Sequence, residues 1–318
     1  MSNILILKFG ALGDVVMATS LMQQIQRHHA HDRIWLLTSP AYVDIFKDWD
    51  GLHVIAFDRK GPLAMINALI WIRKTDFSRV YDLQSSDRSA ALCALSGIPE
   101  RVGNHPRFPY NIHPVDKYTG QCHIYARMLE VLRSAGIPPA YGPPVLPLSE
   151  TDKKYVCHWL KKNELLQRPF VILHPGASPR HPEKRWPYFL ELALALKESG
   201  YTIVWVGAEN EREMNRIYSG QVGIDASAIF SINMLAELGR QACFAVTNDS
   251  GPMHVLSCSG MPVYAFFGPT NWRRNHAIGQ AENIIVSVDS DPEKFRPSSL
   301  DNISPSLVLG RLRERKLL

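Results

Sequence analysis

The sequence has few cysteines, no long apolar run and only a small net charge, and each of these features argues against a class of protein. The 318 residues include only five cysteines, which are scattered and form no CxxC pair. This usage is typical of reduced thiols in a cytoplasmic protein, and it argues against a disulfide framework or a structural zinc site. No apolar run reaches the ~18 residues that a membrane-spanning helix needs, so we expect no transmembrane segment.

The charge balance excludes further classes. The net charge is +5, which allows an anionic partner but is too small to indicate nucleic acid. The sequence also lacks the interleaved basic and aromatic residues on which single strands stack. The N-terminus has neither a basic region nor a cleavage site ahead of its first strand-like run, so we expect no signal peptide and a cytoplasmic location.

Metal-ligand patterns are missing as well. The 12 histidines include no HExxH motif. Two acidic triplets, DWD at Asp48–Asp50 and DSD at Asp289–Asp291, lie in a turn-like segment and in a polar tail. We interpret both as turns, and we expect no metal site.

The chain does contain a repeated alternation of buried strands and helices. The strand-like runs are NILILKF, RIWLLTS, HVIAFD and RVYDLQ in the first half, and PFVILHPG, YTIVWVGA, FAVTND and PVYAFFGP in the second. Short apolar strands that alternate with helices predict parallel sheets covered on both faces.

A proline-rich stretch separates the two series. Residues 136–149, GIPPAYGPPVLPLS, contain five prolines and two glycines and cannot form a core element. We therefore predict an α/β protein of two doubly wound, Rossmann-like domains, 1–148 and 149–318, that face a central cleft. The last helix, at about 304–318, is expected to pack back on the N-terminal domain.

The first strand ends in FGALGD, where Gly10, Gly13 and Asp14 stand at the mouth of a predicted helix. A carboxylate there could cap the helix, bind a ribose or act as a base. The motif lacks the GxGxxG spacing of a dinucleotide-binding turn, and the second strand ends in LLTSP without an acidic residue. Both features argue against a dehydrogenase.

Two strand ends of the second half carry groups suited to a nucleotide. In HPGASPRHPEKRW, a tight loop at Ser178 precedes Lys184, and backbone N–H groups with an ammonium suit a diphosphate. A solvated basic loop is an equal alternative. After VWVGA, Glu209 could hold a ribose diol or favour the dipole of a following helix.

The segment TNDSGPMH is more specific. Asp249 and Ser250 are helix-capping residue types, Gly251 lets a ligand approach the backbone, and His254 lies one turn into the helix. A helix N-terminus of this kind favours an anion. Capping explains Asp249 or Ser250, but it does not explain Gly251 or His254.

Three segments, in this order and spacing, resemble the heptosyltransferase family (glycosyltransferase family 9): FGALGDVVMATSLMQQI, HPGASPRHPEKRWP and NDSGPMHVLSCSGMPVYAFFGPT. The resemblance covers nearly the whole chain and is weakest across 40–165. It implies an inverting glycosyltransferase of GT-B architecture that transfers heptose from ADP-heptose to a sugar hydroxyl of the lipopolysaccharide inner core. It implies no cofactor, and a lipid-linked anionic oligosaccharide as acceptor.

The resemblance also implies roles for individual residues. Asp14 would be the general base, with Gly10 and Gly13 leaving room for the acceptor. Lys184 would hold the pyrophosphate, Glu209 the ribose, and the segment 230–232 would lie near the adenine. The implied donor-binding residues are Ser178, Lys184, Glu209, Ile232, Asp249, Ser250, Gly251 and His254.

Two segments raise the question of the acceptor and of a membrane. The stretch 101–133 is basic through Arg101, His105, Arg107, His113, Lys117, His123, Arg127 and Arg133. A phosphorylated or acidic sugar would suit this stretch, with Arg101 and Arg107 as acceptor-side residues, but a solvated face has equal weight. The helix GPLAMINALIWIRK could touch the cytoplasmic face of the inner membrane through Ile70 and Trp71, although packing on its sheet is the more frequent use of such a helix.

Two other functions remain as alternatives. A glycosyltransferase of the same fold could use another nucleotide-sugar, or an acceptor in capsule or protein glycosylation. A non-catalytic nucleotide-sugar-binding protein would need the second domain but not Asp14.

Overall fold

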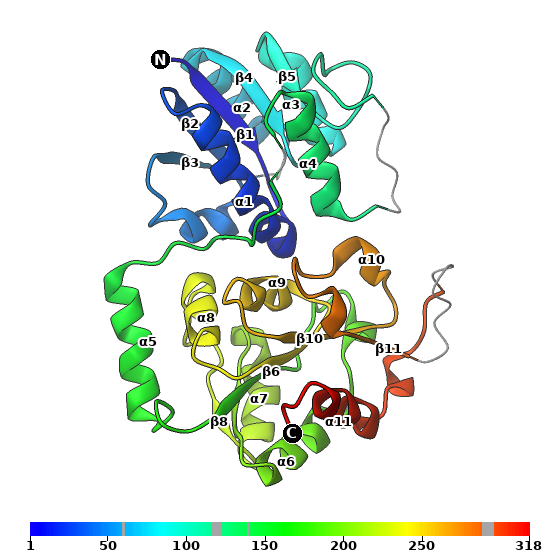
Figure 1. Ribbon diagram of the computed structural model, residues 1–318. Coiled ribbons are helices and arrows are strands. Elements are labelled where there is room, and N and C mark those ends of the chain that lie inside the picture. The colour runs from blue at the N-terminus through cyan, green and yellow to red at the C-terminus, as the bar shows by residue number, and fades with distance from the viewer. Residues whose placement is uncertain (59–60, 116–121, 139, 288–295) are drawn as a thin grey trace. The chain divides into compact units, whose positions relative to one another are not determined.

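The computed structural model describes residues 1–58, 61–115, 122–138, 140–287 and 296–318. The chain divides into two compact units, Met1–Pro147 and Leu148–Leu318, which are coloured blue to green and green to red in Figure 1. The division falls one residue before the boundary expected in the proline-rich stretch.

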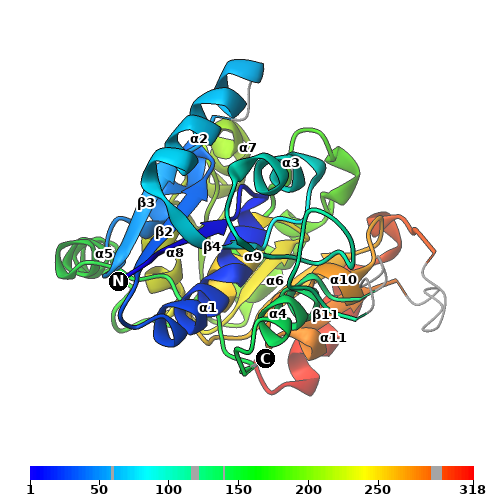
Figure 2. The same cartoon turned by 90° about the horizontal axis from the view of Figure 1, so that it is seen from above.

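The N-terminal unit contains a parallel sheet of five strands in the order β3-β2-β1-β4-β5. Its strands are β1 (Asn3–Leu7), β2 (Arg33–Thr38), β3 (Leu52–Ala56), β4 (Phe77–Asp82) and β5 (Glu100–Val102). Its helices are α1 (Leu12–His28), α2 (Pro62–Thr75), α3 (Asp87–Ser96) and α4 (Ile124–Ser134), with a 3-10 helix at Pro40–Phe46. Helix α1 packs with α4 and helix α2 with α3, on opposite faces of the sheet (Figure 2).

The C-terminal unit contains a second parallel sheet, in the order β11-β10-β9-β6-β7-β8. Its strands are β6 (Phe170–His174), β7 (Thr202–Trp205), β8 (Ile224–Asp225), β9 (Ala245–Asn248), β10 (Val263–Phe267) and β11 (Ile284–Val286). Its helices are α5 (Glu150–Lys162), α6 (Phe189–Glu198), α7 (Arg212–Ser219), α8 (Ile232–Gly239), α9 (Gly251–Ser257), α10 (Trp272–Asn275) and α11 (Pro305–Glu314).

The fold class predicted from the sequence, α/β with two doubly wound sheets of the GT-B type, is confirmed. The strands of each sheet are parallel, so their carboxyl ends meet at one edge, where ligands of such folds bind. In the C-terminal unit this edge collects the segments after β6, β7, β9 and β10. Within the described residues, every helix is too short or too polar to cross a bilayer.

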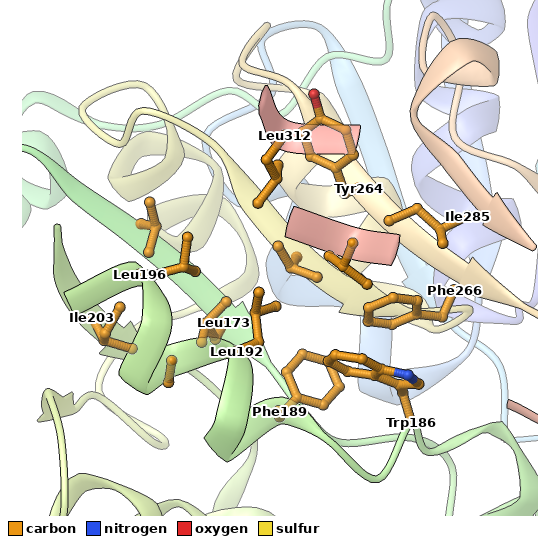
Figure 3. Packing of buried hydrophobic residues seen from close by; sticks show 14 of the residues in the cluster. Leu173, Trp186, Phe189, Leu192, Leu196, Ile203, Tyr264, Phe266, Ile285 and Leu312 are labelled. Atoms are coloured by element: carbon orange, nitrogen blue, oxygen red, sulfur yellow. The ribbon is translucent and has the colours of Figure 1, made fainter. Parts of the chain in front are cut away.

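Helix α11 differs from the expectation. Val308 and Leu312 are fully buried in the core of the C-terminal unit, in one cluster with Leu196 of α6 and Tyr264 of β10 (Figure 3). The expectation that this helix returns to the N-terminal domain is therefore wrong, because its apolar face completes the core of its own unit. The hydroxyl of Tyr201 fixes the end of the chain by donating to the carbonyl of Leu317 at 2.5 Å.

Candidate functional site

An ion pair lies at the carboxyl edge of the second sheet. The Nζ atom of Lys184 lies 2.6 Å from Oδ2 of Asp249, and Oγ1 of Thr270 donates to the same oxygen at 2.6 Å. Lys184 is only 17% exposed and Asp249 only 8%, so water screens the pair poorly. The structure thus brings together two residues expected from separate motifs, together with Thr270, which follows β10 at the end of the motif segment FFGPT.

The side chain of Asn248 fixes the segments that carry this ion pair. Its Nδ2 donates to the carbonyls of Pro175 and Gly176 at 2.9 and 3.0 Å, and its Oδ1 accepts the N–H of Trp186 at 3.0 Å. One buried amide therefore joins β9 to the loop after β6 and to the start of the segment leading into α6. Lys184, two residues before Trp186, is held in place by this junction.

Trp186 anchors the same segment in the core. Its ring stacks on Phe266 with centroids 4.2 Å apart, and its Nε1 donates to the carbonyl of Ile303 at 2.8 Å (Figure 3). The K-x-W spacing in the sequence thus combines an apolar anchor with a lysine two residues earlier. The lysine is left at the edge of the sheet while the tryptophan is buried.

Ser250 belongs to a second polar group at this edge. Its Oγ lies 3.3 Å from Nδ1 of His174, the last residue of β6, and donates to the carbonyl of Asn248 at 3.2 Å. Ser250 precedes α9, but its side chain makes no capping bond to that helix. Ser250 thus occupies the N-cap position, but its hydroxyl faces the strand ends and does not cap the helix. Gly251 is the first residue of α9, and His254 is buried one turn further on.

Of the two glutamates after β7, the buried one is Glu211. Glu209 is 72% exposed and pairs with Arg212 at 2.7 Å. Glu211 is 8% exposed; its Oε2 accepts the N–H of Ala208 at 2.8 Å and lies 3.4 Å from Nε2 of His174. Burial raises the pKa of Glu211, but the hydrogen bond and the charge of His174 lower it more, so this pKa lies below its ordinary value.

Two glycines make the space that Glu211 occupies. A Cβ on Gly176 would lie 1.6 Å from Oε1 of Glu211, and one on Gly207 would lie 2.9 Å from its Oε2. A side chain at either position is therefore incompatible with this carboxylate. The glycines at the ends of HPG and WVG were the available sequence signal for a buried group between the two strands.

Ser178 and Ile232 lie outside these bonded groups. Ser178 is exposed in the loop after β6, where its carbonyl accepts the N–H of His181 at 2.8 Å. Ile232 is the first residue of α8, which Ser231 caps. Phe230, beside it, packs on Trp159 with ring centroids 5.0 Å apart.

In the N-terminal unit, the loop between β1 and α1 is held by its neighbours. Oε1 of Gln84 accepts the N–H groups of Phe9 and Gly10 at 2.8 and 3.2 Å. Gly10 has φ 141°, and a Cβ there would lie 2.9 Å from the ring of Tyr42. A glycine is thus required at this position by backbone conformation and by packing. Gly13 is buried in the first turn of α1.

Asp14 is the third residue of α1 and is partly exposed. Ala11 occupies the cap position, so the helix-cap interpretation of Asp14 is wrong. A carboxylate in the first turn still interacts favourably with the helix dipole. Asp14 therefore leaves its oxygens available for chemistry more readily than a capping residue would.

A buried lysine that the sequence reasoning missed lies behind Asp14. Lys8 follows β1, is 2% exposed, and donates from Nζ to the carbonyl of Leu83 at 3.0 Å. Burial lowers the pKa of Lys8 below its ordinary value, while the negative charges of Asp14 and Asp82 act in the opposite direction. Burial raises the pKa of Asp82, which accepts hydrogen bonds from Tyr110 and two backbone N–H groups. The sequence signal for these buried charges was a charged residue at the end of each of two apolar strands, Lys8 after β1 and Asp82 in β4, which are neighbours in the sheet.

The basic stretch is used in part for structure. Arg101 donates to the carbonyls of Pro109 and Ile98 at 2.6 and 2.5 Å, so its guanidinium is largely committed to its own loop. Arg107 is exposed, and Arg133 pairs with Glu130 at 2.6 Å. Lys117 lies outside the described residues.

The described residues contain no group of three His, Cys, Asp or Glu side chains placed to hold a metal ion. The triplet Asp289–Asp291 lies outside them, and Asp48–Asp50 forms the turn between the 3-10 helix and β3. The expectation that no metal takes part stays a prediction.

Comparison with known proteins identifies the family. The model of glycosyltransferase family 9 (heptosyltransferase) matches residues 70–303. The chain is 29% identical over 268 residues to lipopolysaccharide heptosyltransferase 2 of Escherichia coli, with 76% of each chain covered. A family 9 glycosyltransferase of Veillonella parvula has a similar structure, with a TM-score of 0.83, 22% identity, and coverage of 98% of this chain and 96% of that one. The structure of the E. coli ADP-heptose lipopolysaccharide heptosyltransferase II gives a TM-score of 0.76 at 23% identity, covering 98% of both chains. With a family model that spans most of its length, this chain belongs to glycosyltransferase family 9, the heptosyltransferases.

Proposed function

We propose that the protein is an inverting heptosyltransferase that moves a heptose from ADP-heptose to a sugar hydroxyl of the lipopolysaccharide inner core. The observation that carries the proposal is the partly buried Lys184–Asp249 pair at the carboxyl edge of the second sheet, in a chain of this family. The donor and the acceptor are taken from the E. coli relatives, whose names state both. The acceptor is accordingly a lipid-linked anionic oligosaccharide.

The C-terminal unit would bind the donor. Lys184 would neutralise the diphosphate as the bond to the sugar breaks, which is the moment when the leaving group gains charge. Asp249 and Thr270 orient the ammonium, and Ser250 and Gly251 at the same edge offer a hydroxyl and a backbone N–H. Ser178, His254 and Ile232 are further donor-side candidates on the neighbouring segments. With this positive charge supplied by the protein, we propose that no metal and no cofactor are required.

The N-terminal unit would bind the acceptor. Asp14 takes the proton from the attacking hydroxyl, and direct displacement inverts the anomeric centre without a covalent intermediate. Gly10 and Gly13 would leave room for the acceptor, and Arg107 offers an exposed guanidinium to an acidic group on it. Arg101 would contribute mainly by shaping the loop that carries Arg107.

Lys8 is proposed as a positioning residue for Asp14. Lys8→Met is expected to lower turnover roughly tenfold, which corresponds to about 1.4 kcal/mol of lost charge stabilisation. The melting temperature of this variant should also fall, because the buried carbonyl of Leu83 loses its hydrogen-bond donor. Enzyme kinetics and thermal unfolding test this, with Lys153→Met, on the exposed face of α5, as control. A lower melting temperature with unchanged turnover would assign Lys8 a structural role alone.

Replacing the two glutamates after β7 one at a time is expected to affect ribose binding in one variant and stability in the other. Glu209→Gln should weaken ADP binding by ~10-fold or more, because a charge-assisted bond to the diol is lost. Glu211→Gln should instead lower the free energy of unfolding. The pKa of Glu211 is lowered in the folded protein, so its contribution is present above the ordinary value of 4.5 and is lost as the pH falls through the lowered pKa.

Calorimetric ADP titration and thermal unfolding between pH 3 and 7 measure both effects. We expect the difference in melting temperature between wild type and Glu211→Gln to shrink toward the acidic end. If Glu211→Gln loses ADP affinity at unchanged stability while Glu209→Gln binds normally, Glu211 is the ribose ligand and the assignment of Glu209 fails.

A transfer assay tests the function as a whole. The protein is incubated with ADP-heptose and a heptose-deficient lipopolysaccharide core in EDTA, and the product is identified by mass spectrometry. The anomeric configuration of the new linkage, determined by NMR, should be opposite to that of the donor. Transfer from another nucleotide-sugar only would favour the alternative donor, and ADP-heptose binding without transfer to any acceptor would favour the non-catalytic alternative.

A further inference from the structure

Helix α2 carries an apolar face that the proposed chemistry does not use. Leu63, Ile66 and Ile70 are 72%, 50% and 47% exposed. Their spacing of three and four residues places them on one side of the helix. We call these three residues the α2 stripe. Three large exposed aliphatic side chains in one row differ from the single exposed apolar residues that are normal on a protein surface.

The stripe belongs to a helix that is firmly attached to its sheet. Ala68 and Ile72 on the opposite side are buried in the core cluster of the N-terminal unit. Trp71 packs on Phe77 and Trp35, with ring centroids 5.3 and 5.9 Å apart. Of the two residues expected to touch a membrane, Trp71 is thus used for packing, and Ile70 remains exposed. The exposure of the stripe is therefore a property of a fixed helix.

The charge on α2 is of one sign. The helix contains no acidic residue, and its last turn carries Arg73 and Lys74. The guanidinium of Arg73 is held at the helix end by the carbonyl of Leu95, to which its Nη2 donates at 2.7 Å. Leu95 is itself 52% exposed and extends the apolar surface beyond the last turn. Aliphatic side chains followed by two cations, of which Arg73 is held in place, match the order of acyl chains and phosphates at a lipid surface.

A pocket of about 270 Å³ lies along the adjoining side of the same helix. Its lining includes Ala64, Asn67 and Trp71 of α2, with Phe57 and the single acidic residue Asp58 after β3. These α2 positions follow the stripe around the helix, so the pocket and the stripe form neighbouring parts of one surface. An acyl chain is a ligand of suitable chemistry for a mostly apolar pocket beside an interfacial helix.

We propose that the α2 stripe lies in the interfacial layer of a bilayer that contains anionic phospholipid, with Arg73 and Lys74 at the level of the phosphates. The row of aliphatic residues, a helix without acidic side chains and the two terminal cations favour lipid over a protein partner. The contact itself does not depend on heptosyl transfer. It deepens the proposed function only in that a lipid-linked acceptor would reside in the same layer.

Vesicle co-sedimentation without donor or acceptor tests the proposal. The wild-type protein should bind phosphatidylcholine vesicles that contain phosphatidylglycerol more tightly than pure phosphatidylcholine vesicles. The triple variant Leu63→Ser/Ile66→Ser/Ile70→Ser should lose at least ~10-fold in partitioning to the mixed vesicles. Lys74→Gln should lose about fivefold on the mixed vesicles and nothing on the neutral ones.

A matched control removes the same number of exposed aliphatic side chains elsewhere. Leu166, Leu194 and Ile217 of the C-terminal unit are 50%, 42% and 55% exposed, and replacing all three with serine should leave vesicle binding unchanged. Equal melting temperatures of the two triple variants exclude unfolding as the cause. Unchanged binding of the α2 triple variant would overturn the proposal. So would a wild-type dimer in light scattering that this variant abolishes, because the stripe would then face a second copy.

Discussion

Replacing Asp14 with asparagine is expected to lower turnover by at least ~10²-fold while leaving ADP affinity nearly unchanged. Asparagine keeps the size of the side chain and its place in the first turn of α1, but it cannot accept the proton of the acceptor hydroxyl. Steady-state kinetics with ADP-heptose and an inner-core acceptor measures the loss, and calorimetry with ADP measures the retained affinity.

The chain offers a matched control for this experiment. Asp87 is also an acidic first-turn residue, at the start of α3 in the same unit. Asp87→Asn removes the same favourable interaction with a helix dipole, so any general effect of such a change on stability appears in both variants. If Asp14→Asn turns over at the wild-type rate, the assignment of Asp14 as the base fails.

Replacing Lys184 with alanine is expected to weaken ADP-heptose binding ~10-fold to 100-fold, because the charge-assisted bonds to the diphosphate are lost. The same change leaves the carboxylate of Asp249, which is only 8% exposed, without its cation. That carboxylate would then repel the diphosphate, and it would also cost stability. Calorimetry and thermal unfolding of the variant record the two effects separately.

The double variant Lys184→Ala/Asp249→Asn separates ligand binding from ion pairing. If Lys184 serves only to neutralise Asp249, the double variant should regain both stability and donor affinity. If the ammonium contacts the diphosphate, stability should recover while the affinity stays low. Recovery of the full ADP-heptose affinity would remove Lys184 from the donor site.

The sheets and their division could be predicted from sequence because buried parallel strands read as continuous apolar runs. The domain on which α11 packs could not be predicted. Val308 and Leu312 require an apolar surface, but they do not specify which domain supplies it. The same limit applies to Glu209 and Glu211. Both follow the same strand, and only the side-chain geometry shows that Glu211 fills the space beside Gly176 and Gly207.

Sequence motifs indicate polar residues at strand ends but not the partners of those residues. Asp249 lies in a run of polar residues, and the structure pairs it with Lys184, 65 positions away. Motifs are also ambiguous where a residue type has two ordinary uses. Ser250 reads as a helix cap by sequence, yet its hydroxyl faces His174, and Lys8 reads as the polar end of a strand, yet it is buried.

The amide of Asn248 shows how a residue in a motif can be fixed by the backbone and carry no information on substrate specificity. Its two donor hydrogens meet two carbonyl oxygens, and its oxygen meets an N–H group, so aspartate would place like partial charges together on the donor side. Asparagine is thus dictated at this position by the path of the backbone and not by the sugar that is transferred. Relatives that transfer different sugars can therefore share this asparagine. Its presence in a sequence reports the shape of a loop, and the identity of the substrate must be sought in residues that are free to vary.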